Sequence, residues 1–133
     1  MTTFVDTNVL IDVLEVDSVH HQWSRTALEA AKKNGPVFVS DAVYSELSVT
    51  FDTAEATDSV INQLALVRCG YSNQVLFDAG KAYARYRSNQ GQKLNVLPDF
   101  FIGALAASEE APVVTRDPGK IRTYFPDVQI VSP

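Results

Sequence analysis

The sequence of 133 residues has few of the side chains that bind soft metals or form disulfides. It contains one cysteine, Cys69, and two adjacent histidines, His20 and His21. A lone cysteine cannot form an internal disulfide. The two histidines are poor ligands of a shared metal, because neighbouring residues of a helix point about 100° apart. Because no CxxC or HxxxH spacing is present, no zinc site is predicted. We interpret both histidines as surface residues.

The sequence also lacks the run of about 20 apolar residues that a membrane span needs. Its first residues show neither the basic start nor the apolar stretch of a signal peptide. We find no repeat, low-complexity tract or linker. Hydrophobic residues make up 46% and charged residues 20% of the chain, which is typical of globular proteins. We therefore expect one domain over residues 1–133, located in the reducing cytoplasm.

Basic residues are scarce in the first half of the chain. Residues 1–67 carry 3 basic and 10 acidic side chains, a balance of −7, whereas residues 68–133 carry 8 and 6, a balance of +2. The net charge of −5 argues against a general nucleic-acid coat protein. The uneven distribution indicates either solvated helix faces or an acidic pocket bordered by a basic surface.

Short apolar segments alternate with helical patterns. Strands are predicted at residues 3–6, 36–40, 67–71, 113–115 and 128–131. Helices are predicted over residues 8–15, 18–33, 41–51, 54–66, 73–90, 98–108 and 119–124, with a loop over 91–97. In the second helix, Val19, Trp23, Ala27 and Ala30 have the spacing of one face. Because the strands are apolar without period-two alternation, the pattern predicts a parallel sheet covered by helices on both faces, an α/β sandwich.

Acidic side chains follow several of these strands. Ligands of such sheets bind outside the carboxyl ends of the strands, where Asp6, Asp41, Glu46 and Asp117 are expected; Asp99 begins the apolar helix. Each alone has a structural explanation, and Asp41 is interpreted as a helix cap. Spacing leaves open whether Asp41 or Glu46 faces the pocket. Together these carboxylates would repel one another, and an oxygen-preferring cation such as Mg²⁺ would neutralise them.

Four blocks of sequence carry a family resemblance: FVDTNVLI at 4–11, VSDAVYSEL at 39–47, LPDFFIGALAAS at 97–108 and VVTRDPGKIRTYFPDVQIV at 113–131. With these blocks in order, the chain resembles the PIN-domain ribonucleases, and among them the VapC-type toxins of bacterial toxin–antitoxin modules. The resemblance implies a PIN-like α/β/α sandwich with a short parallel central sheet. It also implies a single PIN domain over residues 1–133.

The resemblance implies a set of site residues. The family's acidic quartet corresponds to Asp6, Glu46, Asp99 and Asp117, which selects Glu46 over Asp41 for the pocket. Asn8 and Thr115 correspond to its supporting polar residues. We expect Asp6 and Asp99 to hold the principal metal, with Glu46 and Asp117 acting through water or a second ion. Basic residues of the second half are predicted to guide RNA to this pocket: Arg85, Arg87, Arg116, Lys120 and Arg122.

The implied function is that of a Mg²⁺-dependent endoribonuclease toxin, with Mn²⁺ able to substitute. Such an enzyme hydrolyses RNA phosphodiester bonds with a metal-activated water. The implied partners are an RNA substrate, a cognate antitoxin and a second copy of the chain in a homodimer. Contact with DNA is expected only through the antitoxin, and no contact with a membrane is expected.

Three alternatives follow from the same residues. Cleavage through the RNA 2′-hydroxyl needs acid and base groups near neutral pKa, usually histidines, and both histidines lie away from the strand ends. A phosphate-accepting α/β protein would be a receiver domain or a haloacid-dehalogenase-type phosphatase, and the latter needs a second Asp two residues after the first, where this chain has Asn8. A catalytically silent module that only binds its antitoxin and DNA is disfavoured by the intact acidic residues.

Overall fold

The structure is a computed structural model that describes residues 1–89, 91–92 and 96–133. Its sheet has five strands: β1 (Thr3–Val5), β2 (Val37–Ser40), β3 (Val67–Cys69), β4 (Val113–Val114) and β5 (Ile130–Val131). The strand order is β3-β2-β1-β4-β5, and every neighbouring pair is parallel. The predicted parallel sheet is confirmed, with β1 at its centre.

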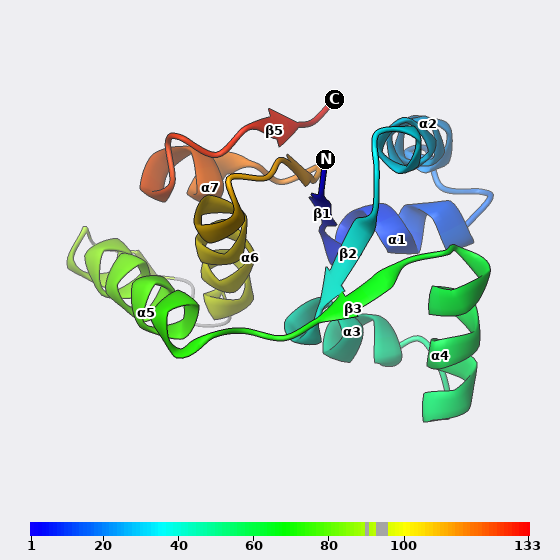
Figure 1. Ribbon diagram of the computed structural model, residues 1–133, viewed down its shortest axis with the longest axis horizontal. Coiled ribbons are helices and arrows are strands. Elements are labelled where there is room, and N and C mark those ends of the chain that lie inside the picture. The colour runs from blue at the N-terminus through cyan, green and yellow to red at the C-terminus, as the bar shows by residue number, and fades with distance from the viewer. Residues whose placement is uncertain (90, 93–95) are drawn as a thin grey trace.

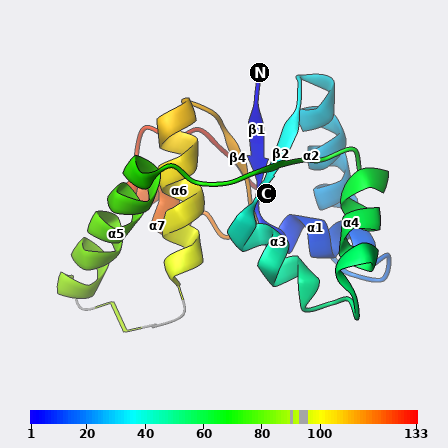
Figure 2. The same ribbon diagram turned by 60° about the horizontal axis from the view of Figure 1, so that its bottom comes forward.

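Helices cover the sheet on two sides. They are α1 (Thr7–Leu14), α2 (His21–Lys33), α3 (Asp41–Ser48), α4 (Ala54–Gln63), α5 (Asn73–Ser88), α6 (Leu97–Glu109) and α7 (Gly119–Tyr124). Figures 1 and 2 show α5, α6 and α7 on one side of the strands and α1, α2 and α4 on the other, while α3 contacts α1, α4 and α6. In the described part of the chain, no helix is both long and apolar enough to cross a membrane.

The core lies between these helices and the central strands. Val5, Val39 and Val113 are fully buried, and Phe100 of α6 is buried against them. The middle of α6, Phe100 and residues 102–106, is buried, as its apolar sequence predicts, whereas residues 107–109 are exposed. Because helices cover both faces of the sheet, the ends of the central strands are where a ligand is expected to bind.

The apolar face predicted for the second helix is confirmed only in part: Trp23 and Ala27 pack against the core, but Ala30 is exposed. Residue 18 does not begin that helix, which starts at His21, so Val19 precedes it and is 91% exposed. The buried residues of α2 are Ser24, Leu28 and Ala31. The difference arises because Ser24 is buried by a hydrogen bond to a buried carboxylate, a contact that hydrophobic spacing does not reveal.

Helix ends differ by a few residues from the predictions. Ser40, rather than Asp41, is the N-cap of α3, because its hydroxyl accepts a hydrogen bond from the Val43 amide. The predicted helix over 41–51 ends at Ser48, and the one over 54–66 ends at Gln63. The predicted loop over 91–97 includes residues 93–95, which lie outside the described residues.

Candidate active site

Asp6 is the centre of a hydrogen-bond network at the end of β1. It is the N-cap of α1, and its Oδ1 accepts a hydrogen bond from the Thr7 amide at 2.8 Å. Its Oδ2 accepts hydrogen bonds from Thr115 Oγ1 at 2.7 Å and from Asn8 Nδ2 at 3.3 Å. Burial raises the pKa of this carboxyl, although the hydrogen bonds from Thr115 and Thr7 oppose the rise. Asp6 is therefore both a helix cap and a member of the acidic cluster.

Asn8 and Thr115 connect α1 to the segment after β4. The Asn8 side chain donates to Thr115 Oγ1 at 3.5 Å and accepts a hydrogen bond from the Arg116 amide at 3.1 Å. Thr115 Oγ1 also accepts a hydrogen bond from the Asp117 amide at 3.0 Å. The hydroxyl of Thr115 thus fixes the backbone of Asp117 relative to the carboxylate of Asp6.

Glu46 of α3 joins the same region through Thr7. The Thr7 hydroxyl donates to Glu46 Oε1 at 2.9 Å, while the Thr7 amide binds Asp6. Burial raises the pKa of the Glu46 carboxyl; the Thr7 hydrogen bond lowers it, and the charge on Asp6 raises it. Sequence reasoning missed Thr7, although its place between Asp6 and Asn8 in the DTN motif was a signal. Asp41 instead forms an exposed ion pair with Arg68 at 2.7 Å.

Asp99 lies in the first turn of α6, and its pKa is raised by burial and by the charges on the three other acidic residues of the quartet. Burial and then the charge on Asp6 raise the pKa of Asp99 to about 6, and the charges on Asp117 and Glu46 add to the rise. Lys120 lowers this pKa, because its Nζ lies 3.7 Å from Asp99 Oδ2. The four acidic residues therefore share one electrostatic environment, into which Lys120 projects a positive charge.

The donor set fits a hard divalent cation in its chemistry. The quartet and its supports offer carboxylate, amide and hydroxyl oxygens, which Mg²⁺ and Mn²⁺ prefer. Within the described ranges, however, no three His, Cys, Asp or Glu side chains are grouped closely enough to hold a metal as they stand. A cation held by both Asp6 and Asp99 would therefore need these side chains to rearrange, and it would compete with Lys120 for Asp99.

Arg116 does not project its guanidinium among the quartet. Its Nε and Nη2 donate to the two carboxylate oxygens of Asp12 at 2.5 and 3.1 Å, and Asp12 is only 3% exposed. Sequence reasoning did not single out Asp12, although it lies one helical turn after Asn8. Lys120 is instead the basic residue that lies beside Asp99, whereas Arg116 acts on the pKa of Asp6 only through its charge, which lowers it.

The other basic residues predicted to bind RNA lie on the surface. Arg85 and Arg87 are exposed near the end of α5, and Arg87 Nη1 donates to the Gly91 carbonyl at 3.0 Å. Arg122 of α7 is exposed and donates to Ser132 Oγ at 3.2 Å. Both helices lie on the α6 side of the sheet (Figure 2), which is the side that carries Asp99.

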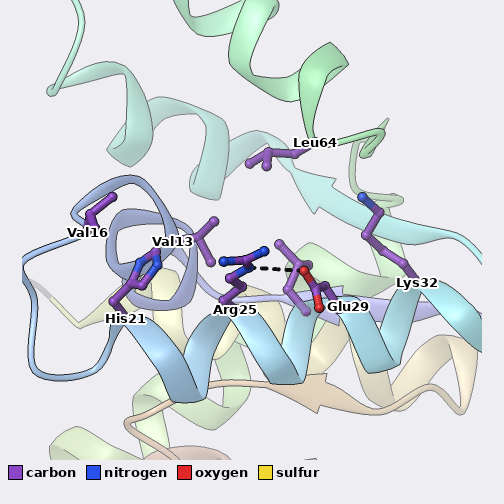
Figure 3. A pocket seen from close by; sticks show the side chains of 8 residues that line it. Val13, Val16, His21, Arg25, Glu29, Lys32 and Leu64 are labelled. Atoms are coloured by element: carbon purple, nitrogen blue, oxygen red, sulfur yellow. Dashed lines mark hydrogen bonds and ion pairs between the residues drawn. The ribbon is translucent and has the colours of Figure 1, made fainter.

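The histidines lie apart from the quartet. His20 is exposed, and His21 Nδ1 lies 2.9 Å from the Asp12 carbonyl oxygen. His21 also lines a cavity of about 370 Å³ between α1, α2 and Leu64. Figure 3 shows two of the charged groups of that cavity, Arg25 and Glu29, paired with each other, and Lys32 also lines it. The Arg25–Glu29 distance is 3.1 Å. This arrangement offers no acid–base pair of histidines for cleavage through a 2′-hydroxyl.

Solved structures with the same fold include toxin–antitoxin complexes. VapBC2 from Rickettsia felis, bound to a promoter DNA fragment, is 19% identical, with a TM-score of 0.75 and coverage of 100% of this chain and 99% of the other. A toxin–antitoxin complex from Klebsiella pneumoniae is 22% identical, with a TM-score of 0.71 and coverage of 98% and 97%. FitAcB from Neisseria gonorrhoeae is 19% identical, with a TM-score of 0.63 and coverage of 98% and 97%.

The sequence comparison gives the family directly. No curated protein sequence matches the chain. The PIN domain family, in contrast, matches residues 3–126, nearly the whole length and all four acidic positions. The resemblance inferred from the four sequence blocks is confirmed, and the chain belongs to the PIN domain family.

Proposed function

We propose that this protein is a metal-dependent endoribonuclease and the toxin of a toxin–antitoxin pair. The observation that carries the proposal is the coupling of the quartet: burial raises the pKa of Asp6, Glu46 and Asp99, and the other acidic side chains add to each rise. Carboxylates that destabilise one another at a strand edge are a costly arrangement for a protein that only binds a partner. They suit a site that takes up a divalent cation and an anionic substrate.

Asp6 and Asp99 would hold Mg²⁺ or Mn²⁺, with Glu46 and Asp117 acting through water or a second ion. A bound divalent cation supplies an acidified water and stabilises charge on the phosphoryl oxygens. Glu46, which accepts a hydrogen bond from the Thr7 hydroxyl, would accept a proton from the attacking water. Asn8 and Thr115 hold Asp6 and the Asp117 backbone in place. In-line attack would form a bond from the water oxygen to phosphorus and break the P–O3′ bond. The departing 3′ oxygen would take a proton from solvent, which leaves a 5′-phosphate and a 3′-hydroxyl.

RNA is the proposed substrate, and the exposed basic residues would contact its phosphates. Arg85, Arg87 and Arg122 are exposed on the same side of the sheet as Asp99, and Lys120 lies beside its carboxylate. Arg116 has a different role in this proposal, because Asp12 occupies its guanidinium. We assign it to holding the Thr115–Asp117 segment.

The related structures support an antitoxin as one of the proposed partners. Complexes named VapBC and FitAB contain a toxin-like fold together with an antitoxin, and several are bound to DNA. We infer that this chain binds a cognate antitoxin, contacts DNA only through it, forms a homodimer and acts in the cytoplasm.

Two alternatives compete with this proposal. A phosphate-transfer enzyme would use a second acid at position 8, but Asn8 is engaged with Asp6 and the Arg116 backbone. A silent binding module would leave cellular RNA intact. Mapping of RNA 5′ ends after brief expression of the wild type and of Asp6→Asn distinguishes these functions. New 5′-phosphate ends should appear with the wild type alone, and identical maps would favour the silent module.

A further inference from the structure

A cavity of about 550 Å³ opens beside the acidic quartet. Its walls include Tyr86 of α5 and, from the segment after β4, Asp117, Lys120, Thr123 and Tyr124. This volume falls within the range of about 300–1,000 Å³ that is usual for sites of small ligands. Because Asp117 belongs to the quartet, the cavity is continuous with the candidate active site.

Lys120 connects the cavity to the acidic residues. It lines the cavity, and its Nζ lies 3.7 Å from Asp99 Oδ2. An ammonium group in this position would attract a phosphate next to the one that is cleaved. The same side chain therefore faces both the proposed reaction centre and the adjoining cavity.

Tyr124 lies four residues after Lys120 on α7, so both side chains project from the same face, one helical turn apart. Its ring packs against Phe100, with centroids 5.5 Å apart, and against Tyr86, with centroids 6.2 Å apart. Its hydroxyl accepts a hydrogen bond from Asn89 Nδ2 at 3.3 Å. These contacts hold the half-buried ring in one orientation at the wall of the cavity.

We propose that this cavity is a nucleobase subsite, in which Tyr124 stacks on the base of a nucleotide next to the scissile phosphate while Lys120 contacts its phosphate. The inference rests on the proposed ribonuclease function and extends it. Single-stranded RNA is commonly recognised by bases that stack on aromatic side chains. The spacing of one helical turn, about 5.4 Å, allows the two side chains to contact neighbouring parts of one nucleotide. Tyr124 then becomes a residue that determines sequence preference at the cut.

The cavity in Figure 3 offers a comparison within the same molecule. Its lining residues include no Phe, Tyr or Trp, and besides aliphatic side chains they include Lys32. Two of its groups could stack on a base, His21 and Arg25, but they contact the Asp12 carbonyl and Glu29. We expect it to ignore nucleobases, so its backbone amides serve as an internal control.

The first test uses NMR titration without metal, so that binding is read without cleavage. The probes are the four nucleoside 5′-monophosphates and, as a base-free control, ribose 5-phosphate. At least one nucleotide should shift the amides of residues 119–124, with an affinity at least about fivefold above that of ribose 5-phosphate, while the amides of His21 and Arg25 stay unchanged. Tyr124→Phe should keep this preference, and Tyr124→Leu, which keeps apolar bulk, should lose it. Equal shifts by nucleotides and ribose 5-phosphate, or shifts elsewhere only, would overturn the subsite.

The second test uses cleavage of an RNA pool with random sequence. The wild type and Tyr124→Phe should share a base preference at one position beside the cut, and Tyr124→Leu should flatten it, with the rate on the favoured sequences falling toward the rate on the disfavoured ones. An unaltered preference in Tyr124→Leu would contradict the assignment. If the wild type cleaves no RNA but still prefers nucleotides over ribose 5-phosphate, the ribonuclease proposal fails and the base site stands.

Discussion

Asp12 and Arg116 lie 104 residues apart in the chain and form a two-point ion pair between α1 and the segment after β4. Ser24 of α2 adds a hydrogen bond to Asp12 Oδ2 at 2.7 Å. Burial alone would raise the pKa of the Asp12 carboxyl, but the contacts with Arg116 and Ser24 outweigh it and hold the pKa below its usual value. Arg116 lies between Thr115 and Asp117 in the sequence, and Asp12 lies on α1, the helix that carries Asn8. The Asp12–Arg116 ion pair therefore holds residues 115–117 against α1.

Removing the Asp12 carboxylate should destabilise the protein strongly. Breaking a buried pair by deleting one partner costs about 3–5 kcal/mol, so Asp12→Ala should lower the free energy of unfolding by about 3 kcal/mol. Asp41→Ala is a matched control, because the Asp41–Arg68 pair is exposed and should contribute no more than about 1 kcal/mol. Urea denaturation measures both values. Equal losses in the two variants would show that the buried Asp12–Arg116 pair contributes no more to the free energy of unfolding than the exposed Asp41–Arg68 pair.

The metal-free protein should lose stability as pH rises through the titration of Asp99. The pKa of Asp99 is raised from 3.8 to about 6 in the folded state. Its contribution to stability is therefore fully present below pH 4 and is lost as pH rises through about 6. A two-unit shift corresponds to about 2 kcal/mol after allowance for partial exposure. Melting temperatures in EDTA between pH 4 and 8 measure this loss.

Asp99→Asn should not show the loss of stability that comes from ionising Asp99. In EDTA at pH 7.5 this variant should therefore melt at or above the wild-type temperature. Excess Mg²⁺ should then raise the melting temperature of the wild type more than that of the variant, because a ligand stabilises the state that binds it. Asp117→Asn should behave in the same direction. Metal-free variants clearly less stable than the wild type would identify these acids as structural partners rather than metal ligands.

The sequence predicted the sheet, its helical layers and the strand ends that carry acidic residues. Those features depend on local apolar patterns, which β1, β2 and α6 show clearly. Asp12 and Thr7 were missed because their importance comes from contacts with Arg116 and Glu46, which are distant in the sequence. Arg116 was expected near the acidic quartet for the same reason: charge patterning places it close to Asp117 but does not reveal the buried carboxylate that binds it.

RNA binding should weaken with salt in proportion to the phosphate contacts. Replacing Arg85, Arg87, Lys120 or Arg122 by Gln should each flatten the slope of log K against log salt by about 0.7, the value for one lost contact on a single strand. Arg116→Gln should instead lower the melting temperature, because it leaves Asp12 unpaired. Binding to fluorescent single-stranded RNA at several salt concentrations gives the slopes. Unchanged slopes would indicate that these basic side chains are solvated at the surface and do not contact RNA phosphates.

Loss of the Thr7 hydroxyl should lower the cleavage rate by more than its effect on folding stability would explain. Thr7→Val removes the hydrogen bond to Glu46 Oε1 while keeping the shape of the side chain, and we expect the cleavage rate to fall by about tenfold. Thr123→Val is the control, because that exposed hydroxyl donates to the Gly119 carbonyl of its own helix. Single-turnover rates at saturating RNA compare the two. A wild-type cleavage rate in Thr7→Val would show that the orientation of Glu46 by the Thr7 hydroxyl does not contribute to cleavage.

The most direct measurement is RNA cleavage by the purified chain with Mg²⁺, with Mn²⁺ and with EDTA, beside Asp6→Asn. The account predicts cleavage with either metal, none in EDTA, ends with 5′-phosphate and 3′-hydroxyl, and a loss of at least about 100-fold in the variant, which keeps the cap but not the charge. Full activity in EDTA, or 2′,3′-cyclic phosphate ends, would contradict it.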